Sequence, residues 1–172
     1  MCIRDRAVTL LDFICTHVGD AGASALAAAL GRGALPGLKH ITAGNCATAI
    51  GDAGLVALAP ALRRRPALEL LTLSRNPLSD EGLAALVAPP PAAGAPPPPT
   101  GGLTKLKALN LQYTQITEAG CATLTAALDS GALPALEELY LHGIPASAAA
   151  KAAVRAATPT CGAGSISCGD MV

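Results

Sequence analysis

The strongest constraint on the fold of this chain is an aliphatic pattern that returns at a nearly fixed period. Five residues mark it, namely Leu11, Ile41, Leu71, Leu109 and Leu139, which are separated by 30, 30, 38 and 30 residues. A period in this range is typical of a solenoid, in which one supersecondary unit is repeated and stacked. One unit alone buries too little apolar surface to fold, so neighbouring units are expected to share a continuous core.

Each unit opens with the pattern of a short strand. In residues 106–112, Leu106, Leu109 and Leu111 are interleaved with polar residues, and from Leu109 onward the alternation has period two. This spacing predicts a half-buried strand with one face in the core and one face outside.

A four-residue turn motif follows each of the first four strands and predicts the start of a helix. It reads small residue, acid, any residue, glycine, and it occupies residues 19–22, 51–54, 79–82 and 117–120. Thr117 suits a helix N-cap, and Glu118 places negative charge in the first turn, where the helix dipole favours it. Leu124 and Leu128 then share one helical face. Glycine is a weak helix former, so its recurrence indicates close packing of neighbouring units.

Together these patterns resemble the ribonuclease-inhibitor-like leucine-rich repeat over residues 8–157. Similar arrays occur in the sensor ends of NOD-like receptors and in GTPase-activating proteins that act on Ran. The resemblance implies a right-handed α/β horseshoe solenoid of about five strand–helix units, with a parallel sheet on its concave face. One departure concerns the asparagine position, which holds Asn76 in one unit but Thr16 and Thr114 in two others.

The predicted organisation is one repeat array between two irregular ends. Its units are expected at residues 8–37, 38–67, 68–102, 103–135 and 136–157. A proline-rich loop at residues 88–102 accounts for the longer spacing; it is interpreted as a tolerated insertion, with docking to an SH3, WW or EVH1 domain as the alternative. Residues 158–172 are expected to form a flexible tail, and the chain is expected to be a fragment.

Residues 1–7 are expected to be non-native or disordered. The stretch Met1–Asp5 resembles the translation of a sequencing-library adapter, and the repeat pattern starts only at Val8. A genuine short N-terminal extension is the alternative interpretation.

Composition disfavours several classes of function. The net charge is zero and the pI is near 6.8, so nothing favours a nucleic acid or an anionic membrane as partner. No uninterrupted apolar run reaches the length of about 18 residues that a membrane span needs. The cysteines form no CxxC motif and are expected to be reduced in a cytoplasmic protein, with a Cys161–Cys168 disulfide in a secreted array as the alternative.

No catalytic residue, metal ion or cofactor is expected. The histidines at positions 17 and 142 belong to units one and five, so repeat stacking should hold them roughly 20 Å apart. Cys15 and His17 are close in sequence, but two ligands do not make a zinc site. The basic run Arg63–Arg65 follows a predicted helix and is interpreted as a solvated C-terminal cap, with an anion-binding patch as the alternative.

The remaining hypothesis is surface recognition without catalysis or a small-molecule substrate. Outward strand residues should form two rows, the first Asp12, Thr42, Thr72, Asn110 and Tyr140, the second Ile14, Gly44, Ser74, Gln112 and His142. Tyrosine and arginine are enriched at binding hot spots. The predicted protein-binding residues are Thr72, Arg75, Asn110, Gln112, Tyr113, Tyr140 and His142. The alternatives are a fragment of a GTPase-activating or NOD-like regulatory protein, and a spacer without a specific ligand.

Overall fold

The protein alternates short strands with helices along its whole described length. The computed structural model describes residues 8–14, 16–44, 50–87 and 102–158. Its elements are β1 (Leu10–Asp12), α1 (Asp20–Gly31), β2 (His40–Thr42), α2 (Asp52–Arg63), β3 (Leu70–Thr72), α3 (Asp80–Val87), β4 (Ala108–Asn110), α4 (Glu118–Asp129), β5 (Glu138–Tyr140) and α5 (Ala148–Ala157). The predicted N-terminal segment 1–7, all of the proline-rich loop 88–102 except residue 102, and all of the tail 158–172 except residue 158 lie outside the described residues.

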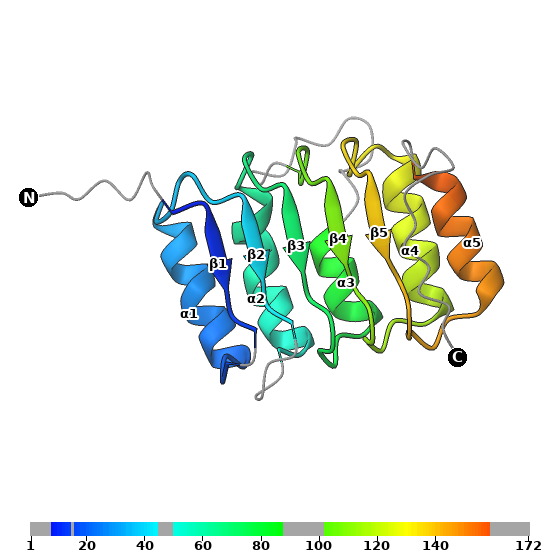
Figure 1. Ribbon diagram of the computed structural model, residues 1–172, viewed down its shortest axis with the longest axis horizontal. Helices are drawn as coiled ribbons and strands as arrows, with labels where there is room; N and C mark the ends of the chain where they lie inside the picture. Colours follow the sequence, from blue (N-terminus) through cyan, green and yellow to red (C-terminus); the bar gives the residue numbers. More distant parts are fainter. Residues whose placement is uncertain (1–7, 15, 45–49, 88–101, 159–172) are drawn as a thin grey trace, which may run out of the picture.

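The five strands form one parallel sheet in the order β1-β2-β3-β4-β5. Its register pairs the predicted anchors with one another, in the sequence Leu11, Ile41, Leu71, Leu109 and Leu139. The sheet is open and is not closed into a barrel (Figure 1). The predicted α/β solenoid with a parallel sheet is therefore confirmed.

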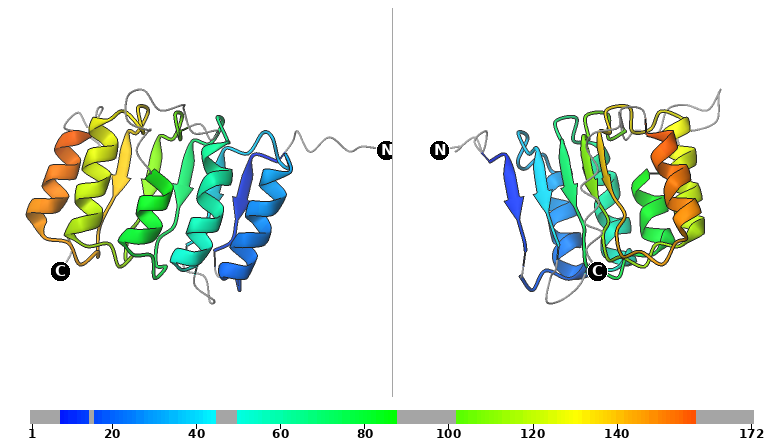
Figure 2. Two further views of the ribbon diagram at one scale, coloured as in Figure 1. Left: turned by 180° about the vertical axis from the view of Figure 1, so that it is seen from behind. Right: turned by 45° about the vertical axis from the view of Figure 1, so that its right-hand side comes forward.

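The molecule has two layers. All five helices cover the same face of the sheet, and each helix packs beside the helix of the next unit (Figure 2). No helix of the described residues lies on the opposite face, which we call the exposed sheet face (Figure 1). This arrangement follows from the sequence, because each strand buries its central residue and each helix offers only one apolar stripe.

One continuous core lies between the layers. Ile41, Leu71 and Leu109 are fully buried, as are the helix residues Leu58 and Leu124. Each such side chain contributes about 1.5–3 kcal/mol when it leaves water. The end units are less covered, since the strand residues Leu11 and Leu139 are only partly buried. Lateral stacking of units therefore supplies most of the burial, as expected for a solenoid.

The asparagine position ties neighbouring units together in only one place among the described residues. The Asn76 side chain is 2% exposed, accepts the N–H of Ile50 at 3.0 Å and donates to the carbonyl of Ala43 at 2.6 Å. The hydroxyl of Thr114 donates to Leu111 of its own unit at 2.8 Å. Threonine thus satisfies its own turn, whereas asparagine also links its unit to the preceding one.

Helix N-caps follow the sequence prediction. The Thr117 hydroxyl accepts the backbone N–H of Ala119 at the start of α4, and the Ser147 hydroxyl accepts that of Ala150 at the start of α5. Glycine occupies the N-cap of α1 and α2 and offers no side-chain acceptor. These two helices need another way to satisfy their first N–H groups.

For α2 the acid of the preceding turn motif meets that need, which the helix-dipole interpretation did not anticipate. Asp20 Oδ1 accepts from the N–H of Gly51 at 2.7 Å and of Gly54 at 3.1 Å, so α1 caps α2. Equivalent bonds run from Asp52 to the start of α3, from Asp80 to the start of α4 and from Glu118 to the start of α5. We call this series the acid ladder.

Three of the four motif glycines, Gly54, Gly82 and Gly120, make room for the acid ladder. A Cβ placed at Gly54 would lie 2.5 Å from Asp20 Oδ1, and one at Gly82 would lie 2.5 Å from Asp52 Oδ1. At Gly120 the corresponding atom would collide with Asp80 Oδ1. The expected close packing of neighbouring units at these glycines is confirmed.

Candidate interaction surface

The exposed sheet face is built from the first and third residue of every strand. The third residues form the predicted row, in register as Asp12, Thr42, Thr72, Asn110 and Tyr140. The first residues form a parallel row that the sequence analysis missed, in register as Leu10, His40, Leu70, Ala108 and Glu138. Strand alternation could have found it, because residues on either side of a buried anchor share the outer face.

The second predicted row continues beyond the strand ends. Backbone pairing persists there, since the N–H of Arg75 donates to Gln112 at 2.8 Å and that of Tyr113 donates to His142 at 2.9 Å. One member of the row was placed wrongly, because Gly44 is buried. A Cβ at Gly44 would lie 2.7 Å from Ser74 Oγ, so the serine of the next unit covers it.

Three of the predicted residues meet at the carboxyl end of the sheet. The guanidinium carbon of Arg75 lies 4.8 Å from the centroid of the Tyr113 ring. The His142 ring contacts the same tyrosine edge-to-face, with centroids 5.3 Å apart and planes at 84°. Tyr113 remains 47% exposed. We call these three residues the Arg–Tyr–His cluster; they come from three consecutive units.

The backbone of this cluster is unusual. Arg75 and Tyr113 adopt φ of 56° and 54°, in the left-handed region, and the equivalent residue of the fifth unit is Gly143 with φ of 70°. The left-handed backbone conformation costs a residue other than glycine about 1–2 kcal/mol. Two units therefore keep a large side chain at a position where glycine fits with less strain.

The other four predicted residues have different surroundings. Asn110 Oδ1 accepts the N–H of Gln112 at 3.0 Å, which fixes the turn after β4. The Tyr140 hydroxyl donates to Glu138 Oε2 at 2.9 Å, and this bond raises the pKa of Tyr140. Thr72 is half-buried in the middle of its row. These residues line the exposed sheet face, and one of them, Gln112, also accepts the backbone N–H of Arg75 at 2.8 Å.

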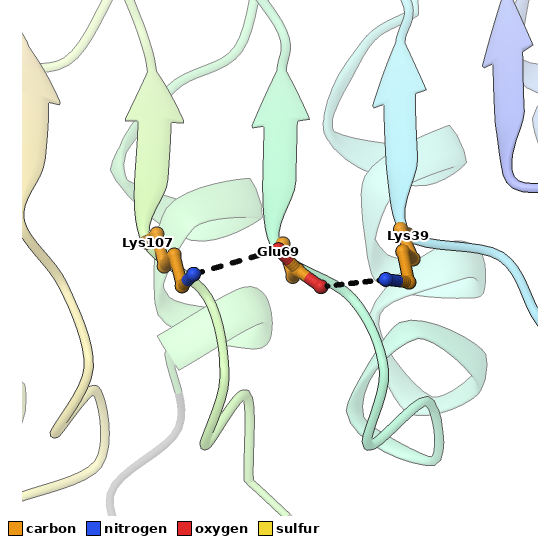
Figure 3. Close-up of polar contacts among 3 residues, drawn as sticks. All are labelled: Lys39, Glu69 and Lys107. Atoms are coloured by element: carbon orange, nitrogen blue, oxygen red, sulfur yellow. Dashed lines mark ion pairs between the residues drawn. The ribbon is translucent and has the colours of Figure 1, made fainter.

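A charged row lies at the opposite, amino end of the sheet (Figure 3). Glu69 stands between Lys39, at 3.3 Å, and Lys107, at 3.6 Å, and each lysine precedes a neighbouring strand. The hydrogen bond and the charge of Lys39, followed by the charge of Lys107, lower the pKa of Glu69. This row was not predicted, although the residues before β2 to β5 alternate in charge, as Lys39, Glu69, Lys107 and Glu137.

The basic run Arg63–Arg65 at the end of α2 is not a solvated cap throughout, so that interpretation was wrong. Arg64 is exposed, but Arg65 is 9% exposed and donates to the carbonyl of Leu30 in the last turn of α1 and to that of Leu35 beyond the helix. Arg63 reaches the other way and donates to the carbonyl of Ala85 at 2.9 Å. The two side chains join α2 to both neighbouring units, which leaves Arg64 as the exposed residue of the run.

Groups with reactive or metal-binding chemistry do not converge within the described residues. There, no set of three His, Cys, Asp or Glu side chains is arranged to hold a metal ion. Cys121 is a free, buried thiol, and burial raises its pKa. None of the helices in residues 8–14, 16–44, 50–87 and 102–158 combines the length and apolar character that crossing a membrane requires.

Comparison with known proteins identifies the repeat. A family model described as "Leucine Rich repeat" matches residues 7–27, 67–87 and 102–124. Each match contains a strand and the turn after it; the second match then covers all of α3, and the other two cover the first part of α1 and of α4. No curated protein matches the chain. The chain thus contains leucine-rich repeats at three positions, and such repeats are generally protein-interaction modules and typically non-catalytic.

Proposed function

We propose that this leucine-rich-repeat chain is a protein-interaction module that binds a partner protein through the exposed sheet face and the loops after its strands. The observation that carries the proposal is a five-stranded sheet whose helices, in the part of the chain that the structure describes, all lie on one face. Residues on the other face have no core to fill. Since their side chains are not needed to pack the core, they can contact another molecule.

The proposed contact residues are Thr72, Arg75, Asn110, Gln112, Tyr113, Tyr140 and His142. Parallel strands are spaced about 4.8 Å apart, so the rows present one side chain per step to a segment crossing the sheet. Tyr113 is the large aromatic residue most exposed among them, at 47%. A rigid aromatic anchor with polar neighbours is a common composition of binding hot spots.

The proposal also covers the extent, the subclass and the cellular location of the array. We infer an array over residues 8–157, of the ribonuclease-inhibitor-like subclass, in a cytoplasmic protein without catalysis. The small–acid–x–glycine helix start and the strand-anchor spacing support the subclass. The unit bounds 8–37, 38–67, 68–102, 103–135 and 136–157 stay predictions.

The test is a blocking substitution on the exposed sheet face. A library of random 12-residue peptides is selected on the immobilised full chain, and binders are measured again with variants. Thr72→Trp adds a bulky neutral ring to the centre of the face, whereas Ala84→Trp adds the same ring to an exposed position of α3. We expect Thr72→Trp to abolish binding and Ala84→Trp to preserve it. Binders that lose affinity only with Ala84→Trp would refute the proposal.

A further inference from the structure

The side chains of the Arg–Tyr–His cluster already contact one another, and within the described residues the Arg75 guanidinium has no carboxylate partner. Arg75 is exposed and lies over the Tyr113 ring at 4.8 Å, while His142 and the backbone of Gly143 support the other parts of the ring. The side chains are therefore held before any partner arrives. Such preorganisation reduces the entropy lost on binding.

Several carboxylates at the helix starts and on the sheet are engaged by other groups. Asp80 accepts from Thr117, and Glu118 accepts from Ser147, both at helix N-termini. Glu138 accepts from Tyr140, and Glu69 is paired with two lysines at the far end of the sheet. Among the residues that the structure describes, Arg75 forms no ion pair. Its guanidinium donors remain available to an external acceptor.

The backbone adds an independent argument. Arg75 and Tyr113 occupy left-handed positions, with φ of 56° and 54°, where the fifth unit carries Gly143. Glycine at either position would relieve strain, so folding does not explain why the chain has these two side chains there. Strained residues that persist at an exposed site point to a role in recognition.

We propose that the Arg–Tyr–His cluster binds a carboxylate, from an aspartate or glutamate in an extended segment of the partner protein, next to an apolar side chain. This inference rests on the proposed function and specifies its partner. The carboxylate accepts paired hydrogen bonds from Arg75, and the neighbouring apolar side chain packs on the exposed part of Tyr113. One cation suits one carboxylate, whereas a nucleic acid requires several phosphate contacts.

The test uses the same random 12-residue peptide library on the full chain. Peptides whose binding is blocked by Thr72→Trp are sequenced, and their affinities are measured by isothermal titration calorimetry. We expect an aspartate or glutamate at one recurrent position. Arg75→Gln should weaken these peptides about tenfold or more, because a charged, two-point hydrogen bond is lost. Arg32→Gln, an exposed arginine just after α1, removes the same charge elsewhere and should change nothing.

A second variant separates binding from folding. Arg75→Gly removes the side chain and the left-handed strain together, so it should melt at least as high as the wild type and still lose the peptides. Suppose that the peptides whose binding Thr72→Trp blocks contain no recurrent aspartate or glutamate, or that they bind the Arg75→Gly variant with unchanged affinity. Then this inference is wrong, and the proposed function stands. If Thr72→Trp prevents the binding of no peptide, the proposed function is wrong, and so is the proposed carboxylate site.

Discussion

Asp52 and Gly82 are fitted to one another across the boundary between two repeats. Asp52 Oδ1 accepts the N–H of Gly82 at 3.1 Å, and a Cβ at residue 82 would stand 2.5 Å from the same oxygen. Asp52 also accepts from the N–H and the hydroxyl of Ser79, at 2.8 and 2.6 Å. The acid and the glycine of the turn motif are thus halves of one contact, contributed by successive units.

The first prediction distinguishes the acid ladder from the helix dipole. Asp52→Asn should lower the free energy of unfolding by about 1–3 kcal/mol, because buried or partly buried N–H groups lose a charged acceptor. Glu81→Gln also removes an acid from a first helical turn, but the Glu81 side chain is exposed. It should cost about 0.3–1 kcal/mol, the ordinary dipole contribution. Equal losses in urea titrations of the two variants would contradict the ladder.

A second prediction concerns the glycine of the pair. Gly82→Ala should destabilise the protein by about 1–3 kcal/mol, since the added methyl group displaces Asp52. Its matched control is Gly31→Ala at the end of α1, where a Cβ meets nothing within 4 Å. That change should be neutral or stabilising by up to about 1 kcal/mol, through helix propensity. Thermal melting followed by circular dichroism measures both, and a stabilising Gly82→Ala would rule out the tight fit.

The third prediction tests the buried arginine. Arg65→Met should reduce the free energy of unfolding by about 1–3 kcal/mol, because the carbonyls of Leu30 and Leu35 lose their donor. Arg64→Met, one residue earlier and exposed, should stay within about 0.5 kcal/mol. Denaturant titration of the two variants gives the comparison. Similar small effects would mean that Arg65 does not cap α1 in solution.

The fourth prediction concerns pH. The pKa of Glu69 is lowered in the folded protein by Lys39 and then Lys107. Its carboxylate therefore stabilises the fold above the unfolded pKa of about 4.3, and this contribution is lost as the pH falls through the folded value. Carboxyl carbon NMR should show Glu69 titrating below an ordinary glutamate. Lys39→Met should raise its pKa, and Lys105→Met, a control lysine in unit four, should not.

Much of the fold was readable in the sequence because its signals are local and repeated. The anchors Leu11 to Leu139 became register partners, and Thr117 became an N-cap, since strand alternation and capping depend on neighbouring residues. The outward row through Thr72 and Asn110 followed from the same alternation. The spacing of residues therefore identified the proposed contact residues, but it did not predict which of them touch one another.

The sequence by itself determined the repeat, the inner and outer faces, and the residues available for recognition, because each depends on spacing within one unit. Tertiary structure decided what crosses between units. It brought the Asp52 carboxylate to the start of the next helix and buried Arg65 against α1. It also covered Gly44 with Ser74 and brought Arg75 and His142 into contact with Tyr113. The physical reason is that these contacts depend on the stacking distance and on left-handed backbone angles, and the one-dimensional pattern carries neither.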